Sequence, residues 1–298
     1  MLEKYCDIEK RIVPIKDFLE NNKDCNGYKG HYKGIITLNS PLVFQPEILF
    51  IGVNSGEGAY KVLNSDSENN RNITPIRMID QNEMCFKELN WYQKGNARGY
   101  FKNKKEKTGW VSFEWYQRNQ RINNPFIKNM IEFLYEIAKI KFPEEYKVEK
   151  YDHNKEPFWY ENFGKSIMST NLYPIATTNT KDLNKILDSL AEEKELKKYW
   201  EESKGNDKDI NNWTVRKYFI RRVNEFIRLV QPKIIVCLGK TAFNDLTYTN
   251  SKDYNGSKLY FIEKKIGDTI VVIGFSRSGQ WSGLIPEVAK KILEKQLQ

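Results

Sequence analysis

Histidine and closely spaced cysteine pairs are scarce in this sequence, and their scarcity narrows the chemistry open to it. The 298-residue chain has two histidines, His31 and His153, and its four cysteines form no C-x-x-C pair. Structural zinc sites and iron–sulfur clusters use closely spaced cysteine or histidine ligands. We therefore expect no metal ion and no other cofactor, and we interpret Cys237, within IIVCLG, as a buried core thiol.

Long apolar runs are also absent. No segment approaches the roughly 18 uninterrupted apolar residues that a membrane-spanning helix needs. The first residues, MLEKYCDIEKRIVPIKDFLENN, alternate charged and apolar side chains and lack the apolar core of a signal peptide. The sequence therefore predicts a cytoplasmic protein with no membrane partner, and we expect it to be a monomer.

Acidic residues are outnumbered by basic ones. The chain has 48 Lys and Arg against 39 Asp and Glu, which gives a formal net charge of +9. This excess favours a polyanionic partner, and nucleic acid is the commonest one. The alternative is a lysine-rich soluble protein that binds no such partner.

Four short segments rich in Ile and Val have the character of buried strands: residues 47–53, 166–172, 233–238 and 269–275. Helical periodicity over residues 125–142, 213–230 and 286–297 alternates with them. Continuous apolar strands between helices predict an α/β layer fold around a parallel sheet. One face of the helix over 213–230 is basic, and we interpret it as a solvated surface; it carries Arg216, Lys217, Arg221, Arg222 and Arg228.

Two segments do not fit this alternation. Residues 59–124 are polar and Asn-rich, yet aromatic side chains are interleaved there with Lys and Arg. A loop longer than about 15 residues is usually functional or disordered, and the aromatic content argues against disorder. We interpret residues 59–124 as an aromatic, basic insertion on the ligand side of the sheet, and residues 192–212 as a smaller polar insertion containing a helix and a loop. Without an internal repeat or a clean linker, residues 1–298 are predicted to form a single domain.

The predicted strands all end in polar or glycine-bearing corners, namely GVNSGEG, TNLYP, LGKTAF and FSRSGQWSG. In a sheet of this type, ligands bind beyond the carboxyl ends of the strands. Asn54 and Asn171 place a carboxamide, with both a donor and an acceptor, at two of these corners. An isolated asparagine commonly caps a turn, but two at matching strand ends favour a binding site.

These four corners, in this order, resemble the motifs of the uracil-DNA glycosylase superfamily. GVNSG at 52–56 resembles the first motif, G-x-N-P-G, of the mismatch-specific, thymine and single-strand-selective branches, and TNLYP at 170–174 is similar to the segment whose asparagine reads the flipped pyrimidine. Residues 231–243 resemble the third strand and the helix after it, and FSRSG at 275–279 occupies the place of the last motif, usually H-P-S-P or N-P-S-G. Here Ser55 replaces the usual proline, and the last block has no histidine. The resemblance implies a three-layer α/β/α fold with a central, mostly parallel, four-stranded sheet like that of uracil-DNA glycosylases.

The resemblance also implies a reaction, hydrolysis of the N-glycosidic bond of a base that has left the DNA stack. Asn54 would position the attacking water, and Glu57 would activate it or stabilise positive charge on the sugar. Glu57 is alternatively an exposed loop carboxylate with no such role.

Other corner residues would bind the DNA. Asn171 would pair with the Watson–Crick edge of the base, and the backbone of the first corner would approach it closely. The remaining implied contacts are Gly52, Val53, Ser55 and Gly56 at the base, and Ser276, Arg277 and Ser278 at the flanking phosphates. Arg277 would also reach into the gap that the base leaves, or alternatively would only form a salt bridge within the protein.

The reaction class and the substrate complete this interpretation. Neither of the two asparagine-bearing corners has a lysine for Schiff-base chemistry, so we expect a monofunctional DNA glycosylase that excises a flipped-out uracil or modified pyrimidine. The large insertion and the altered last motif suggest a base other than plain uracil, such as a modified cytosine of bacteriophage DNA removed in antiviral defence. Two alternatives stay open: a non-catalytic nucleic-acid-binding protein of the same fold, and an α/β enzyme that acts on a small nucleotide.

Overall fold

The computed structural model describes residues 1–32, 34–35, 37–38, 42, 44–54, 72–74, 98–102, 109–111, 125–141, 143, 167–249, 259–265, 269–275 and 285–296. The helices in these ranges are α1 (Leu2–Glu9), η1 (Lys10–Ile12), α2 (Val13–Asn22), α6 (Pro125–Lys141), α8 (Thr180–Glu192), η5 (Lys194–Leu196), α9 (Lys197–Lys204), α10 (Asn212–Val230), α11 (Lys240–Thr247) and α12 (Ile285–Gln296). The strands are β1 (Gly34–Ile35), β2 (Ile48–Gly52), β3 (Asn72–Thr74), β4 (Arg98–Lys102), β5 (Gly109–Val111), β6 (Ile167–Asn171), β7 (Ile175–Ala176), β8 (Ile234–Leu238), β9 (Leu259–Lys265) and β10 (Thr269–Phe275).

The main sheet has five strands in the order β6-β2-β8-β10-β9. The first four run parallel to one another, and β9 pairs antiparallel with β10 at the edge. The predicted α/β class is therefore confirmed, and each of the four predicted strands forms within a residue or two of its predicted bounds. The predicted number of strands was wrong, because β9 adds a fifth.

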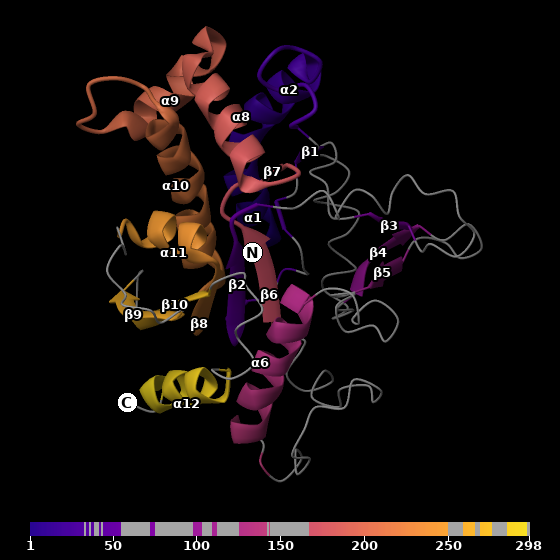
Figure 1. The fold of residues 1–298 in the computed structure, drawn as a ribbon, viewed down its shortest axis with the longest axis vertical. Helices are drawn as coiled ribbons and strands as arrows, with labels where there is room; N and C mark the ends of the chain where they lie inside the picture. The colour runs from indigo at the N-terminus through magenta and orange to yellow at the C-terminus, as the bar shows by residue number, and fades with distance from the viewer. Residues whose placement is uncertain are drawn as a thin grey trace.

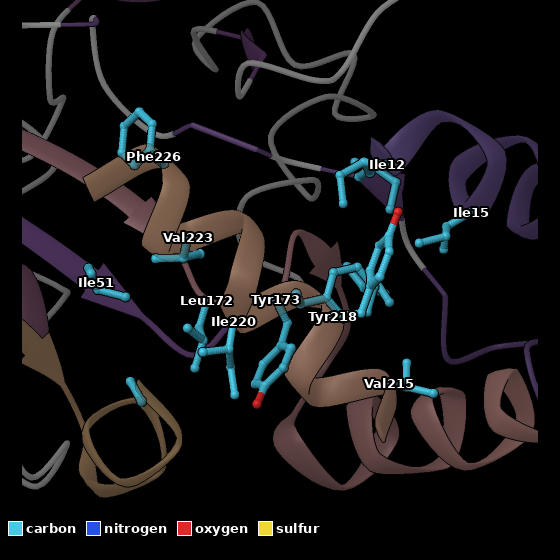
Figure 2. Close-up of a cluster of buried hydrophobic side chains, with 14 of the residues drawn as sticks. Ile12, Ile15, Ile51, Leu172, Tyr173, Val215, Tyr218, Ile220, Val223 and Phe226 are labelled. Carbon is cyan, nitrogen blue, oxygen red and sulfur yellow. The ribbon is translucent and has the colours of Figure 1, made fainter. Parts of the chain in front are cut away.

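Helices cover both faces of this sheet (Figure 1). Side chains of β2 alternate between the faces, as expected for a strand buried on both sides. Leu49 and Ile51 belong to a core formed with α2, α8, α10 and α11, and Figure 2 shows part of this cluster, with Ile51 of β2 and Val223 of α10 among its residues. Phe50 points the other way, and its ring lies edge-on to Phe133 of α6 with the ring centroids 6.2 Å apart. Helix α12 packs beside α6.

The sequence just before helix α10 fixes where this helix begins. The side chain of Asn211 accepts a hydrogen bond from the Thr214 amide at 3.1 Å, and the Thr214 hydroxyl accepts one from the Asn211 amide at 3.2 Å. This reciprocal capping box satisfies two backbone donors at the start of the helix. The apolar face of α10 is buried from Val215 to Val230.

Helix α9 lies within the polar segment 192–212 and is anchored by one aromatic side chain. Trp200 is fully buried, and its indole N–H donates a hydrogen bond to the Leu190 carbonyl at 2.8 Å. Its ring lies edge-on to that of Tyr218, with centroids 5.2 Å apart. This segment therefore contributes to the core on the α10 face of the sheet.

The carboxyl ends of the parallel strands meet at one edge of the sheet. Gly52 pairs with Asn171 of β6 and with Leu238 of β8, so these three strands end in the same row. In chain order the parallel strands lie second, first, third and fourth across the sheet. The chain leaves β2 through α6 on one face and leaves β8 through α11 on the other, which places a topological switch point between β2 and β8. Ligands of open α/β sheets bind in the crevice at such a point.

Within residues 59–124, the described part is a three-stranded antiparallel sheet of order β3-β4-β5. The assignment of this segment as a ligand-side insertion, and of the whole chain as a single domain, stays a prediction. Among the helices that the structure describes, none is long and apolar enough to cross a membrane.

Candidate functional site

The first two corners of the predicted site lie side by side. Gly52 ends β2 and is followed by Val53 and Asn54, while Asn171 ends β6 directly opposite Gly52. The corners stay joined beyond the strands, because the Leu172 amide donates a hydrogen bond to the Gly52 carbonyl at 2.8 Å. The structure thus brings together four of the predicted site residues. The others lie outside the described residues: Ser55, Gly56, Glu57, Ser276, Arg277 and Ser278.

The side-chain amide of Asn54 is held by the segment that follows β6. Its Nδ2 donates hydrogen bonds to the Thr177 hydroxyl at 2.8 Å and to the Ile175 carbonyl at 3.3 Å. A carbonyl can only accept, so the Ile175 contact fixes which end of the amide carries the nitrogen. These two bonds engage both amide hydrogens, and the other tip atom of the side chain is Oδ1, which can only accept.

Thr177, which holds Asn54, is itself fixed. Its side chain is fully buried, and its hydroxyl donates a hydrogen bond to the Asn179 carbonyl at 2.8 Å. Asn179 is the N-cap of α8, where its side chain accepts a hydrogen bond from the Asp182 amide at 3.0 Å. The orientation of Asn54 is therefore coupled to the start of a well-capped helix. Sequence reasoning did not identify Thr177, because nothing in the local pattern links it to a residue more than 100 positions earlier.

Asn171 explains why position 52 is glycine. The Asn171 side chain is buried, with 4% of the residue exposed, and it lies across the Cα of Gly52. A Cβ added to Gly52 would be 2.5 Å from Asn171 Oδ1, which is closer than real side chains approach. The sequence interpretation attributed this glycine to close approach by a ligand, whereas in the structure the group that approaches it is the Asn171 amide.

A polar cluster lies just beyond Asn171. The Tyr173 hydroxyl donates a hydrogen bond to Asp245 of α11 at 2.5 Å and accepts one from Arg216 of α10 at 3.0 Å. Arg216 also forms an ion pair with Asp245 at 2.5 Å. Burial and the neighbouring Asp245 carboxylate raise the pKa of Tyr173 well above its ordinary value. The cluster ties the TNLYP segment to the two helices on this face of the sheet, and Figure 2 shows Tyr173 beside Ile220 of α10.

The prediction that the basic face of α10 is solvated was wrong for Arg216 and Arg222. Arg216 has only 12% of its side chain exposed, and Arg222 is buried in an ion pair with Glu9 of α1 at 2.9 Å. Burial raises the pKa of the Glu9 carboxyl although Arg222 opposes that shift. A helical pattern cannot distinguish a solvated arginine from one whose partner lies 213 residues away.

The chemistry of the remaining described residues is limited. Cys237 is fully buried, as predicted, and burial raises the pKa of its thiol, so it is no nucleophile. Across the described ranges, no three His, Cys, Asp or Glu side chains gather closely enough to hold a metal ion. Among the described residues at this edge, the Asn54 and Asn171 carboxamides suit the binding of an uncharged polar ligand edge or a water.

No protein-family model matches this chain, and no curated protein matches it.

Proposed function

We propose that this protein is a monofunctional DNA glycosylase of the uracil-DNA glycosylase type, which removes a modified pyrimidine from DNA and leaves an abasic site. The observation that carries the proposal is the pairing of Asn54 and Asn171 at adjacent carboxyl ends of β2 and β6. Asn54 follows β2, which borders the switch point where ligands of such folds bind, and Asn171 ends the next strand, β6. The order of the four motif blocks along the chain supports the same fold assignment, as does the confirmed parallel pairing of their strands.

The proposed chemistry uses each carboxamide for a different task. Water adds to C1′ of the sugar while the glycosidic bond breaks, and the base leaves with the bonding electrons and is then protonated. Asn54 would hold the attacking water through Oδ1, and its two hydrogen bonds to Thr177 and Ile175 pre-orient the amide for that task. An amide is not a strong base, so its contribution is positioning and electrostatic stabilisation of the sugar cation.

Recognition of the base falls to Asn171 and the backbone at 52–53. The Asn171 amide offers a donor and an acceptor, which match the polar edge of a pyrimidine. Gly52, Val53, Ser55 and Gly56 would form the wall of the base pocket, and Glu57 would assist the water. Ser276, Arg277 and Ser278 would contact flanking phosphates. The net charge of +9 supports DNA as the partner.

The experiment offers the purified protein duplex and single-stranded DNA that contains uracil, mismatched thymine, 5-hydroxymethylcytosine or glucosylated 5-hydroxymethylcytosine. Abasic sites are detected as strand breaks after alkali. We expect breaks at one of the modified cytosines, and a loss of about 100-fold or more for Asn54→Ala and Asn171→Ala. Asn22→Ala is the matched control, because the Asn22 side chain makes local contacts at its own helix end: its amide donates to the Phe18 carbonyl at 2.8 Å and its oxygen accepts from the Cys25 thiol at 3.7 Å.

The outcomes separate the alternatives. No abasic product from any of these DNAs would refute the glycosylase. DNA binding that weakens with salt, without turnover, would identify a non-catalytic binder. Excision that Asn54→Ala and Asn171→Ala leave unchanged would refute the site assignment and retain the reaction class.

A further inference from the structure

The Arg222 guanidinium contacts three separate parts of the chain, one of which is Asn171 of the candidate site. Its Nε and one terminal nitrogen bind both carboxylate oxygens of Glu9 at 2.9–3.1 Å. The same terminal nitrogen donates to the Thr37 carbonyl at 2.9 Å, and the other donates to the Asn171 carbonyl at 3.4 Å. One side chain from the middle of α10 thus joins α1, the segment before β2, and the last residue of β6.

The Thr37 and Asn171 carbonyls belong to neighbouring antiparallel segments. Residues 34–35 pair with 175–176, and Leu38 forms a bridge with Thr170. The Thr170 hydroxyl also donates to the Thr37 carbonyl, at 2.7 Å. Segment 34–38 therefore runs along the outer side of β6 and β7, and β7 is the strand whose Ile175 carbonyl holds the Asn54 amide. The Arg222 guanidinium therefore holds both segments at once.

A buried ion pair is a poor choice if the only need is stability. Arg222 has 1% of its surface exposed and Glu9 has 3%, so both ions have lost their hydration. Replacing such a pair with well-packed apolar side chains is often neutral or stabilising. An apolar pair, however, would remove the guanidinium that bridges the Thr37 and Asn171 carbonyls, and the Thr37 carbonyl would keep its bond from the Thr170 hydroxyl.

We propose that Arg222 is a positioning residue for the candidate site, with Glu9 as its counter-ion: its planar fork sets the register of segment 34–38 against β6 and so fixes Asn171 against Gly52. The effect of Arg222 on base excision rests on the proposed function. Its effect on the position of Asn171 against Gly52 does not. Arginine suits this task because its donors lie in one rigid plane, and a lysine ammonium cannot reproduce that fork.

The test separates positioning from stability with three variants of the full chain. Arg222→Met leaves the Glu9 carboxylate buried without its partner and lowers the melting temperature strongly. Adding Glu9→Leu removes that carboxylate, so the double variant recovers most of the melting temperature while the Thr37 and Asn171 carbonyls still lack the guanidinium donors. Arg222→Lys keeps the charge beside Glu9 and supplies a folded variant without the fork. Arg221→Met is the matched control, since the neighbouring Arg221 is 48% exposed on the same helix.

The first readout is amide hydrogen exchange at Leu172 and Tyr173, whose N–H groups bond to the Gly52 and Val53 carbonyls. We expect exchange at both amides to accelerate about tenfold or more in the double variant and in Arg222→Lys, while the amides of α8 keep their wild-type rates. The side-chain amide resonances of Asn171 shift in the same variants. Arg221→Met changes none of these signals.

The second readout is base excision, which falls by about 100-fold in the double variant if Asn171 moves by about 1 Å. If the wild type excises no base, the proposed function has failed and the exchange measurement still decides the role of Arg222. Wild-type exchange at Leu172 and Tyr173 in a folded double variant would overturn the proposal. Full excision by a double variant with accelerated exchange would overturn it too.

Discussion

Gly52→Ala is a sharp probe of the contact between the two corners. Gly52 has no left-handed backbone conformation, and the nearest backbone atom to its added Cβ is the Thr170 carbonyl oxygen at an ordinary 3.9 Å. The only severe overlap is with Asn171 Oδ1 at 2.5 Å. Alanine at this position should therefore displace one side-chain amide and little else.

The structure gives the size of that displacement. Ordinary contact begins at 3.4 Å, so the Asn171 tip must retreat by 3.4 − 2.5 = 0.9 Å. Moving the amide forfeits about one hydrogen bond, or about 0.5–1.5 kcal/mol, whereas replacing glycine with alanine stabilises by about 0.4–1 kcal/mol through the unfolded chain. The free energy of unfolding should thus change by less than about 1 kcal/mol. A misplacement of about 1 Å can nevertheless reduce turnover about 100-fold.

A double-mutant cycle measures the effect. Gly52→Ala, Asn171→Ala and the double variant are compared by urea denaturation and by excision of the modified base. We expect strong non-additivity, because Asn171→Ala removes the atom that the new methyl group meets, so the double variant is hardly less active than Asn171→Ala alone. Additive losses, or a Gly52→Ala variant with wild-type turnover, would refute this reasoning.

Three further substitutions test the framework that carries the site. Burial alone would raise the pKa of Glu47, but hydrogen bonds from Lys141 and Lys233 lower it below its ordinary 4.5. Glu47→Gln should therefore lose about 1 kcal/mol of unfolding free energy at pH 7. When denaturation is measured at a series of pH values, the difference from wild type should disappear as the pH falls below 4.5. Trp200→Ala empties a fully buried site and should cost about 3–5 kcal/mol in urea titration. Tyr173→Phe removes a buried hydroxyl but leaves its two partners paired with each other, so thermal unfolding should show a loss of about 1 kcal/mol.

Each of these expectations has a contrary result. A Glu47→Gln deficit that grows as the pH falls would show that the carboxylate is not stabilised by its lysines. A Trp200→Ala cost below about 1 kcal/mol would place Trp200 outside the core. A Tyr173→Phe cost above about 3 kcal/mol would mean that its hydroxyl, and not the Arg216–Asp245 pair, holds the cluster together.

The positions of strands and helices could be predicted from the sequence where a whole strand, or one whole face of a helix, is buried. The strand predicted at 233–238 is observed as Ile234–Leu238, all buried, and the helix predicted at 213–230 is observed as Asn212–Val230. Strand β9 was missed because LYFIEKK ends in charged residues and pairs on one side only, at the sheet edge. An edge strand lacks the continuous apolar run by which the central strands were recognised.

The candidate site could be predicted only in part, because the residues that support it come from distant parts of the chain. Strand-end placement identified Asn54 and Asn171, because the carboxyl ends of parallel strands share one edge. Their supporting groups come from distant segments: Thr177 holds Asn54, and Arg222 with Glu9 lies beneath Asn171. Such partners are set by tertiary packing, and a helical pattern showed only that Arg222 was polar.

The most direct test of the proposed glycosylase activity is a single-turnover reaction in which free base and abasic sites are counted together. The wild-type protein and Asn54→Ala are each incubated in excess over DNA that carries glucosylated or hydroxymethylated cytosine, uracil or mismatched thymine, and the released base is identified by mass spectrometry. We predict that the wild type releases one free modified base for each abasic site, and that Asn54→Ala does so about 100-fold more slowly. If the folded wild-type protein releases no base from any of these DNAs, the proposal that it is a DNA glycosylase is contradicted.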